Sequence, residues 1–452
     1  MERERLGSRL GFILLSAGCA IGIGNVWKFP WMAGQYGGGA FVLLYFIFLI
    51  ILGLPVMTIE FSIGRAAQAS PVRMYQRLEP KGAKWHIHGY ATLIGCVLLM
   101  MFYTSVTGWI LYYFVHSLAG NFVGLDAGQV SAAFGGMMSS PSTMVGYMAI
   151  TVVAGFAVLS IGLQKGLECV TKYMMVALLA LMVVLAVHSG TLSGAGEALR
   201  FYLVPDFSKI SGSVVVGAMN QAFFTLSLGI GAMSIFGSYI GKERSLLGES
   251  VNVVVLDTFV AVTAGLIIFP ACFTYDVQVT AGPSLLFEAM TSVFANMAGG
   301  RWWGSLFFLF MVFAAFSTVL AVFENILACV REMTGWSRGK ACIICGAAVL
   351  LLSVPCALGY NLWSGFHPFG MENLQVLDLE DFLVSNCLLP LGSVIFVLFC
   401  TRKNGFGWDN FVREANEGRG LKIKQWMRGY ITWVLPAIII VIFVLGLISY
   451  FG

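Results

Sequence analysis

The amino-acid sequence predicts an all-α membrane protein with eleven transmembrane helices. Of its 452 residues, 58% are hydrophobic and only 11% are charged. A soluble domain has about 25% charged residues, so this chain has too little polar surface to face water. Apolar runs of about 20 residues, which is the length that crosses a bilayer core about 30 Å thick, recur along the chain. They lie at about residues 10–31, 39–64, 90–118, 143–162, 173–189, 213–240, 251–273, 303–329, 341–360, 380–400 and 429–451.

The composition of these runs excludes a β-barrel. They are rich in Leu, Ile, Phe, Gly, Ala and Met, without the two-residue alternation of transmembrane strands. The first run directly follows Met1–Arg9, is too long for the core of a signal peptide and has no small-residue cleavage site behind it. We therefore expect it to be retained as a helix.

Positive charge predicts the orientation in the membrane. If the N-terminus is cytoplasmic, 22 of the 26 Lys and Arg residues fall in inside segments, and only Arg200, Lys209 and Arg301 fall in outside loops. The positive-inside rule then predicts a cytoplasmic N-terminus and an external C-terminus. The net charge of +4 reports this topology and gives no indication of a nucleic-acid partner.

Cysteine and histidine give no metal or redox signature. Most of the ten cysteines lie in apolar runs, where Cys behaves as a small hydrophobic residue. Cys342 and Cys345 have redox spacing but no second pair, and His86 and His88 have no metal-binding pattern around them. We expect structural roles for all four residues.

Two of the predicted helices look broken. The first contains Gly18, Gly22 and Gly24, and the sixth contains Gly229 and Gly231. Each glycine costs about 1 kcal/mol in a helix interior, so clusters favour unwinding. Close packing of helices on small residues is the alternative explanation for one cluster. Two clusters at equivalent places favour unwinding, which frees carbonyls for a cation and helix N-termini for an anion.

The two clusters also predict an internal symmetry. The segment 20–24 (AIGIG) is echoed by 227–231 (SLGIG), five helices later. Because five is odd, repeats of that length run in opposite directions across the membrane. We expect a single transmembrane domain over 1–452, made of 5+5 inverted repeats at about 9–189 and 213–400, with an extra helix at 429–451.

Several motifs resemble one family. GNVWKFP at 24–30 and GGGAF at 37–41 are followed by PVMTIEFSIGR at 55–65, QAFFTLSLG at 221–229 and AAFST at 314–318. This succession resembles the neurotransmitter:sodium symporter family from Arg9 to about residue 400. Eleven helices resemble its bacterial amino-acid branch, which includes the leucine, tyrosine and tryptophan transporters. The resemblance implies a multi-pass protein of the bacterial inner membrane that imports an amino acid with sodium by alternating access.

The resemblance implies two sodium sites. The first would use the carbonyls of Ala20 and Thr225 and the side chains of Asn25, Thr225 and Asp257, together with the substrate carboxylate. The second would use the carbonyls of Gly18, Ile21 and Ala314 and the hydroxyls of Ser317 and Thr318. A hard cation prefers such oxygen ligands. By itself, Ser317-Thr318 has another explanation, since hydroxyls in membrane helices often bond to the preceding turn.

The resemblance also implies a substrate pocket. Its residues would be Cys19, Ala20, Gly22, Ile23, Gly24, Leu99, Tyr103, Phe224, Thr225, Ser227, Ile230, Thr318 and Val322. Gly22 stands where monoamine transporters have an aspartate, which favours a substrate that brings its own carboxylate. Ile230 stands where the leucine transporter has phenylalanine, which favours a medium to large hydrophobic or aromatic amino acid.

Acidic residues within the apolar runs suggest further roles. A buried acid costs about 2.5–3.5 kcal/mol unless it is compensated. A bound sodium ion could compensate the charge of Asp257. Because Ala261 replaces the serine of chloride-dependent relatives, we expect that transport does not require chloride. We expect Glu60 to bind amides of the unwound sixth helix. Glu324 is a further acid of this kind.

The resemblance implies gates on both sides of the pocket. The outer gate would be Lys28 and Asp381, with lysine in place of the usual arginine fork. The inner gate would be Arg3 and Glu332, with Tyr239 nearby.

Two departures from the family leave an alternative open. Leu6 replaces the usual tryptophan, and Val176 replaces the proline that follows Gly166 in the fifth helix. These replacements would suit a receptor of the same fold that senses substrate with little transport. A channel is disfavoured by a site that looks occluded at both ends, and an enzyme by the lack of a nucleophile–base pair. The sequence leaves the exact amino acid, the sodium stoichiometry and the oligomeric state open.

Overall fold

The computed structural model describes residues 6–279, 282–371 and 374–451. Within this part of the chain, nine helices are long and apolar enough to cross a membrane, and a bent pair adds a tenth span. The pair joins α1 (Arg9–Ala20) to the segment Gly24–Gln35 at an angle of 56°. The remaining span is broken into α11 (Gly212–Thr225) and α12 (Ala232–Gly237). The described residues thus give nine or ten spans by length and apolarity, and counting the broken pair α11 and α12 as one more agrees with the eleven predicted.

Each predicted apolar run corresponds to one span. After α1, the first span continues through a π-helical turn at Gly24–Lys28 into α2 (Phe29–Gln35). The others are α3 (Gly39–Phe48) with α4 (Leu54–Ala67), α6 (His86–Ala119), α8 (Pro141–Ser160), α9 (Cys169–Gly190), the pair α11 and α12, α13 (Leu246–Thr274), α15 (Gly300–Thr334), α16 (Arg338–Leu358), α17 (Val376–Asp381) with α18 (Leu389–Thr401), and α20 (Met427–Gly429) with α21 (Leu435–Phe451). Shorter helices in the connections are α5 (Pro71–Leu78), α7 (Ala127–Met138), α10 (Ala195–Leu203), α14 (Thr291–Asn296) and α19 (Trp408–Ala415).

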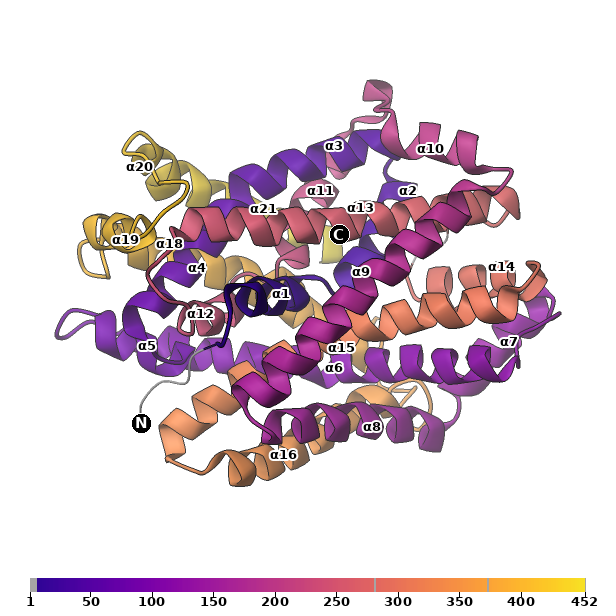
Figure 1. Cartoon of the computed structure of the whole chain (residues 1–452), viewed down its shortest axis with the longest axis horizontal. Helices are drawn as coiled ribbons and strands as arrows, with labels where there is room; N and C mark the ends of the chain where they lie inside the picture. Colours follow the sequence, from indigo (N-terminus) through magenta and orange to yellow (C-terminus); the bar gives the residue numbers. More distant parts are fainter. Residues whose placement is uncertain (1–5, 280–281, 372–373, 452) are drawn as a thin grey trace.

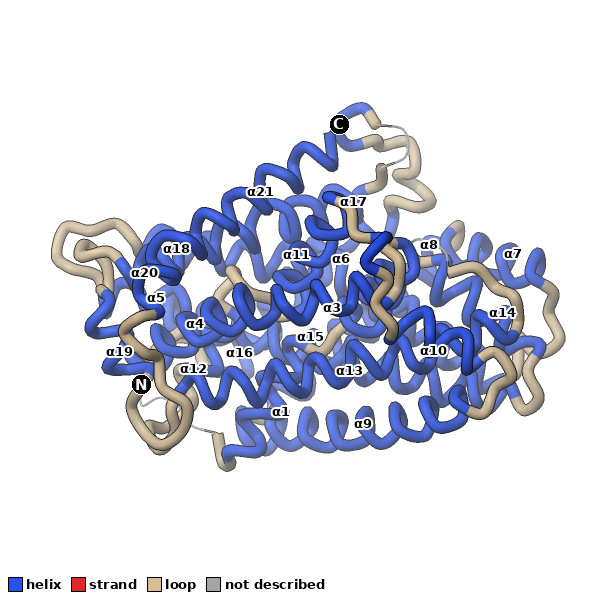
Figure 2. Tube along the Cα trace, turned by 90° about the horizontal axis from the view of Figure 1, so that it is seen from above, coloured by secondary structure: helices blue, strands red, loops and turns tan. Residues whose placement is uncertain are grey.

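The connecting helices gather at two ends of the molecule. Figures 1 and 2 show α5, α19 and α20 at one end of the molecule, near the start of α1, and α7, α10 and α14 at the opposite end. The first group belongs to the segments predicted to face the cytoplasm. The connecting segments are thus separated into two groups at opposite ends of the spans, as the charge distribution predicts.

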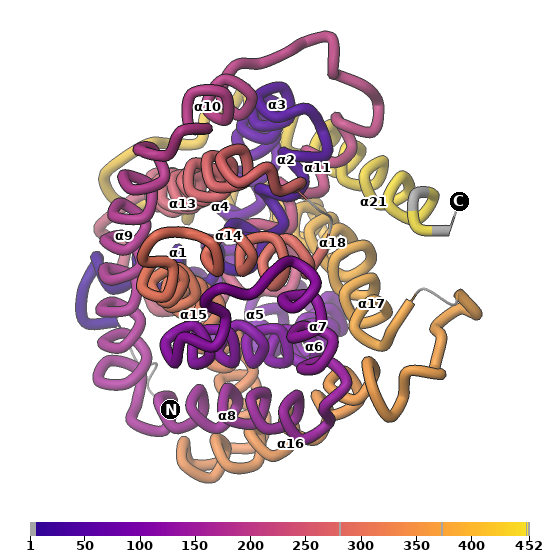
Figure 3. The backbone as a smooth tube through the Cα atoms, turned by 90° about the vertical axis from the view of Figure 1, so that its right-hand side faces the viewer, coloured from indigo at the N-terminus to yellow at the C-terminus, as the bar shows by residue number. Residues whose placement is uncertain are grey.

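The outer helices are those with the least buried surface. Seen along the molecule in Figure 3, α8, α9, α16 and α21 lie at the rim. A smaller share of their apolar residues is buried than in α6 or α15, which pack against each other inside. Apolar side chains that face outward from a helical bundle suit contact with lipid.

The backbone of the sixth span unwinds between α11 and α12. Ser227 and Gly229 have positive φ values of 51° and 99°, a region that favours glycine. The Glu60 carboxylate accepts hydrogen bonds from the amides of Gly229 (2.6 Å) and Met233 (3.3 Å). The prediction for Glu60 is confirmed, since it provides partners for amides that the break removes from the helix.

The fifth span begins against the N-terminal segment. A π-helical turn over Leu163–Glu168 leads into α9, which runs without a break past Val176. Val176 is 54% exposed and faces outward. The Glu168 carboxylate accepts hydrogen bonds from the amides of Gly7 (2.7 Å) and Ser8 (3.1 Å), so it holds the start of the first span beside the fifth.

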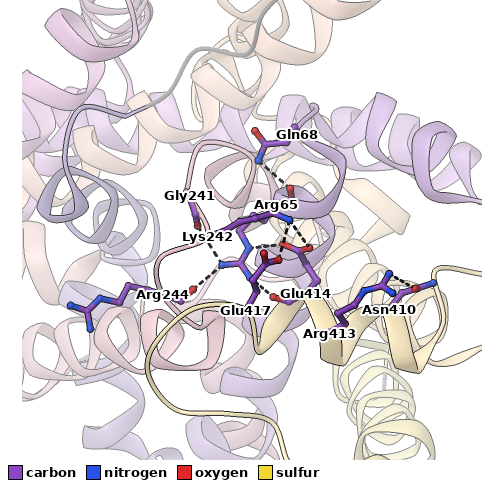
Figure 4. Close-up of polar contacts among 9 residues, drawn as sticks. All are labelled: Arg65, Gln68, Gly241, Lys242, Arg244, Asn410, Arg413, Glu414 and Glu417. Carbon is purple, nitrogen blue, oxygen red and sulfur yellow. Dashed lines mark hydrogen bonds and ion pairs between the residues drawn. The ribbon is translucent and has the colours of Figure 1, made fainter.

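A buried arginine joins three segments at the N-terminal end of the molecule. Figure 4 shows Arg65, at the end of α4, between the α12–α13 connection and α19. Its Nε lies 2.6 Å from Glu414 Oε1, and its Nη1 donates to the carbonyl of Arg244 (2.8 Å). Lys242 pairs with Glu417 at 3.0 Å on the same surface. These contacts attach α19 to the second, sixth and seventh spans.

Candidate substrate and sodium site

A small central cavity lies at the two helix breaks. It has a volume of about 20 Å³ in this conformation. Its lining contains these residues: Cys19, Ala20, Gly22, Gly24, Leu99, Tyr103, Phe224, Thr225, Ser227, Ile230, Thr318, Val384 and Leu389. The structure thus brings together eleven of the thirteen residues that the resemblance implied, from the first, third, sixth and eighth spans.

Two of the implied residues are not in this lining. Ile23 lines a separate, larger cavity, and its amide donates to Tyr103 Oη at 3.1 Å. Val322 lies one helical turn beyond Thr318 and is fully buried in α15. Neither residue lines the central cavity in this conformation, and their roles in substrate binding stay predictions.

Gly22 keeps the polar part of the cavity open. A Cβ atom at this position would lie 2.3 Å from Tyr103 Oη and 2.7 Å from Thr318 Oγ1. Any side chain here would therefore require the two hydroxyl groups to move. At this point the cavity wall consists of the two hydroxyl groups and the backbone, and Gly22 contributes no carboxylate.

A buried carboxylate lies beside the break in the first span. Asn25 Nδ2 donates to Asp257 Oδ1 at 2.8 Å, and Thr225 Oγ1 donates to Asp257 Oδ2 at 3.3 Å. The Tyr45 hydroxyl lies 3.4 Å from the same Oδ2 and 3.5 Å from Thr225 Oγ1. The residues implied for the first sodium site meet here, with Ala20 in the adjoining cavity wall.

Neutral oxygens form a second group at the same break. Ser317 Oγ lies 3.0 Å from the Gly18 carbonyl and 2.9 Å from the Ala314 carbonyl. Thr318 Oγ1 lies 3.2 Å from the Gly18 carbonyl and 3.3 Å from that of Ile21. All five residues implied for the second sodium site are together. Such a set of carbonyls and hydroxyls suits a hard cation of low charge.

The usual side-chain ligands of transition metals do not cluster within the described chain. Across residues 6–279, 282–371 and 374–451, no group of three or more His, Cys, Asp or Glu side chains could hold a metal ion.

A larger cavity of about 270 Å³ lies beside the pocket, on the side that the charge distribution predicts to face outward. Tyr103 and Phe224 line both cavities and so separate them. Lys28 and Asp381 line the outer cavity, but they do not form an ion pair within the described residues. Lys28 Nζ instead lies 3.9 Å from the centroid of the Phe224 ring, and Asp381 accepts a hydrogen bond from Ser385 Oγ (2.5 Å). A cation over an aromatic face is favourable, which accounts for this position of Lys28.

The implied inner gate lies at the C-terminal end of α15. Glu332 accepts hydrogen bonds from the amide and hydroxyl of Ser70, the latter at 2.7 Å. Tyr239 donates to Glu324 Oε1 at 3.0 Å, and Arg338 pairs with Glu324 at 2.6 Å. Arg3, the other implied gate residue, lies outside the described residues.

Comparison with known proteins agrees with this geometry. The profile of the sodium:neurotransmitter symporter family matches residues 3–127 and 133–451. The chain belongs to this family. It is therefore a multi-pass, sodium-dependent symporter, and the inverted repeat predicted from its two broken helices fits the family's fold.

Relatives of the symporter come from several kingdoms. An uncharacterized sodium-dependent transporter of Bacillus subtilis is 36% identical over 88% of this chain and 87% of its own length. A sodium-dependent serotonin transporter of Drosophila melanogaster is 25% identical over 99% of this chain and 77% of its own. The crystal structure of MhsT in complex with L-phenylalanine superposes with a TM-score of 0.87 at 34% identity, covering 98% of this chain and 99% of that one.

Three residues of the candidate site were not predicted from the sequence. Tyr45 contributes a hydroxyl to the Asp257 group, and Val384 and Leu389 complete the central cavity from the tenth span. Each is a common residue of an apolar run, and no motif sets it apart. Only the folded arrangement identifies them.

Proposed function

We propose that this symporter imports a medium to large hydrophobic or aromatic amino acid together with sodium. The observation that carries the proposal is the position of the central cavity, which adjoins both oxygen groups at the first break. The similarity to a structure solved with L-phenylalanine supports the choice of substrate class.

In this proposal, the substrate carboxylate completes the first sodium site. Ala20, Asn25, Thr225 and Asp257 would provide the remaining oxygens. Since Gly22 brings no acid into the cavity, a substrate with its own carboxylate fits better than an amine without one. The Tyr103 hydroxyl, beside Gly22, would hydrogen-bond that carboxylate. The second sodium would be held by Gly18, Ile21, Ala314, Ser317 and Thr318.

We propose that chloride is not required. Asp257 is fully buried, and within the described residues no Lys, Arg or His forms an ion pair with it. A sodium ion would compensate the carboxylate, because opposite charges in contact offset much of their desolvation. The fixed negative charge of Asp257 would then do what a bound chloride does in chloride-dependent relatives.

Transport would proceed by alternating access. Closure on the outside would bring Lys28 toward Asp381 and would seal Tyr103 and Phe224 over the substrate. On the inside, release would require separation at Arg3, Glu332 and Tyr239. The proposed location is the bacterial inner membrane, with the N-terminus in the cytoplasm and the C-terminus outside.

Uptake into proteoliposomes tests the proposal. An imposed sodium gradient should drive accumulation of labelled phenylalanine or leucine, and collapse of the gradient should abolish it. The second candidate is a substrate sensor of the same fold, favoured only by Leu6 and Val176. A sensor would bind the amino acid in a sodium-dependent way without accumulating it, and that result would overturn transport as the function.

A further inference from the structure

The central cavity has an apolar wall from the tenth span. Val384 lies in the π-helical segment Phe382–Leu388, and Leu389 is the first residue of α18. Both line the same cavity as Gly22, Tyr103 and Thr318. Neither carries a polar side-chain atom, so both are suited to contact an apolar part of a ligand.

The π-helical segment brings these two residues onto one face. They are five positions apart, and in a regular α-helix only residues three or four apart face the same way. A π-helix bonds residue i to residue i+5, and such segments occur often at functional sites. The irregular turn therefore lets Val384 and Leu389 line one cavity.

Other apolar residues of the pocket adjoin this wall. A Cβ atom on Gly95 would lie 3.0 Å from Ile230 Cγ2 and 3.5 Å from Leu388 Cδ1. Gly95 is one helical turn from Leu99, which also lines the cavity. The apolar lining residues thus gather where α6, the sixth span and the tenth span meet.

Two glycines fix the distance between the sixth and tenth spans. A Cβ atom on Gly229 would lie 2.1 Å from the Leu389 carbonyl oxygen, and one on Gly392 would lie 2.0 Å from the Gly229 carbonyl oxygen. The two backbones are therefore in direct contact. Because Glu60 also binds the Gly229 amide at 2.6 Å, the unwound segment is held from both sides and the apolar wall is well positioned.

We propose that Val384 and Leu389 receive the side chain of the transported amino acid and determine which sizes are accepted. This inference rests on the proposed import of an amino acid. The polar groups at Gly22, Tyr103 and Thr318 suit the carboxylate and ammonium groups of the substrate. Its side chain is then directed to the apolar wall of the tenth span.

Competition between amino acids tests this role. Purified wild type, Leu389→Ala and Val384→Phe would be compared for sodium-driven uptake of labelled leucine against unlabelled tryptophan, phenylalanine, valine and alanine. Leu389→Ala should shift the ratio of apparent affinities toward tryptophan over valine by about tenfold, because even one methylene changes discrimination by about ten-fold or more. Val384→Phe should exclude tryptophan and retain alanine.

The control is Leu391→Ala on the same helix. Leu391 is 40% exposed and faces away from the cavity, so its truncation should leave all ratios within twofold. A ratio within twofold of wild type in an active Leu389→Ala and an active Val384→Phe would overturn the inference. An equal shift in Leu391→Ala would overturn it too.

Variants that fail to assemble are replaced by the milder Leu389→Met and Val384→Ile. Their preferences should shift at least threefold, measured by sodium-dependent binding of labelled leucine in detergent, and unchanged preferences would reject the role. If wild type accumulates no amino acid in a sodium gradient, the proposed function itself fails. If wild type accumulates leucine and the variants keep its preferences, only the role of the tenth span fails.

Discussion

Asn25 and Asp257 are joined by a hydrogen bond of 2.8 Å between Nδ2 and Oδ1. Asn25 lies in the π-helical turn after the first break, and Asp257 lies in the middle of α13. The bond links the irregular part of the first span to a regular helix that packs beside it. The Asp257 carboxylate also accepts bonds from Thr225 and Tyr45, so donors from three spans converge on one buried acid.

We predict that Asp257→Asn weakens sodium binding without unfolding the protein. Asparagine keeps the shape and one carbonyl oxygen but loses the charge, and a bond to a charged group is worth about 1.5–3 kcal/mol. The half-saturating sodium concentration should rise about tenfold or more. Sodium-dependent uptake measures it, with thermal stability as the control for folding. An unaltered sodium curve would mean that the carboxylate is not a ligand.

We predict that transport by the wild type does not depend on chloride. Asp257 supplies a fixed negative charge beside the proposed first sodium, and Ala261 has no hydroxyl with which to hold an anion. Uptake should remain within about twofold when all chloride is replaced by gluconate at constant sodium. A large drop in gluconate would contradict the role given to Asp257.

We predict that Ser317→Ala combined with Thr318→Ala raises the sodium requirement steeply. The double variant removes two neutral oxygens that lie 3.0 and 3.2 Å from the Gly18 carbonyl. Because Thr318 also lines the substrate cavity, Ser317→Ala alone separates the two effects. Ser305→Ala is the matched control, since Ser305 lies on the same helix and its hydroxyl donates to the carbonyl of Arg301 (2.6 Å). Unchanged half-saturating sodium in the double variant would show that the second site is misplaced.

We predict that Cys19 reports access to the central cavity. It is fully buried yet lines the pocket at the break. In a variant that lacks the other nine cysteines, a small thiol reagent should block uptake, and substrate with sodium should protect. A variant that keeps only Cys400, which is buried outside the cavity lining, is the control. Modification of Cys19 that leaves uptake intact would place its thiol away from the substrate path.

We predict that Glu414→Gln lowers the thermal stability of the protein. Arg65 is fully buried, and loss of the partner of a buried charge costs about 3–5 kcal/mol. The melting temperature in detergent should fall by several degrees. Arg413→Ala is the control, because Arg413 is exposed and its side chain bonds to Asn410 one turn earlier on the same helix. Equal melting temperatures for Glu414→Gln and wild type would show that the pair does not hold α19 in place.

Most of the spans could be predicted because a long apolar run is enough to indicate a helix that crosses a membrane. The breaks could be predicted because glycine clusters weaken a helix wherever they occur. The role of Tyr45 could not, since a tyrosine in an apolar run looks the same whether its hydroxyl points to Asp257 or to a headgroup. The positions of Val384 and Leu389 in the cavity lining could not be predicted for a related reason. Their shared face depends on a π-helical turn, which has no sequence signature. The position of Lys28 depends on the conformation of the gate, which local sequence does not determine.

The contact between Glu168 and the N-terminal segment has a mechanical consequence. Helix α1 is twelve residues long, which makes it a rigid rod of about 18 Å. At one end Glu168 holds Gly7 and Ser8, and Arg9 pairs with Glu249 at 2.9 Å. At the other end the helix stops at Ala20, where Ser317 and Thr318 bond to the carbonyls of Gly18 and Ile21. A short shift of the fifth span at Glu168 would therefore move α1 as a unit and displace the Gly18 carbonyl, which accepts hydrogen bonds from the hydroxyls of Ser317 and Thr318.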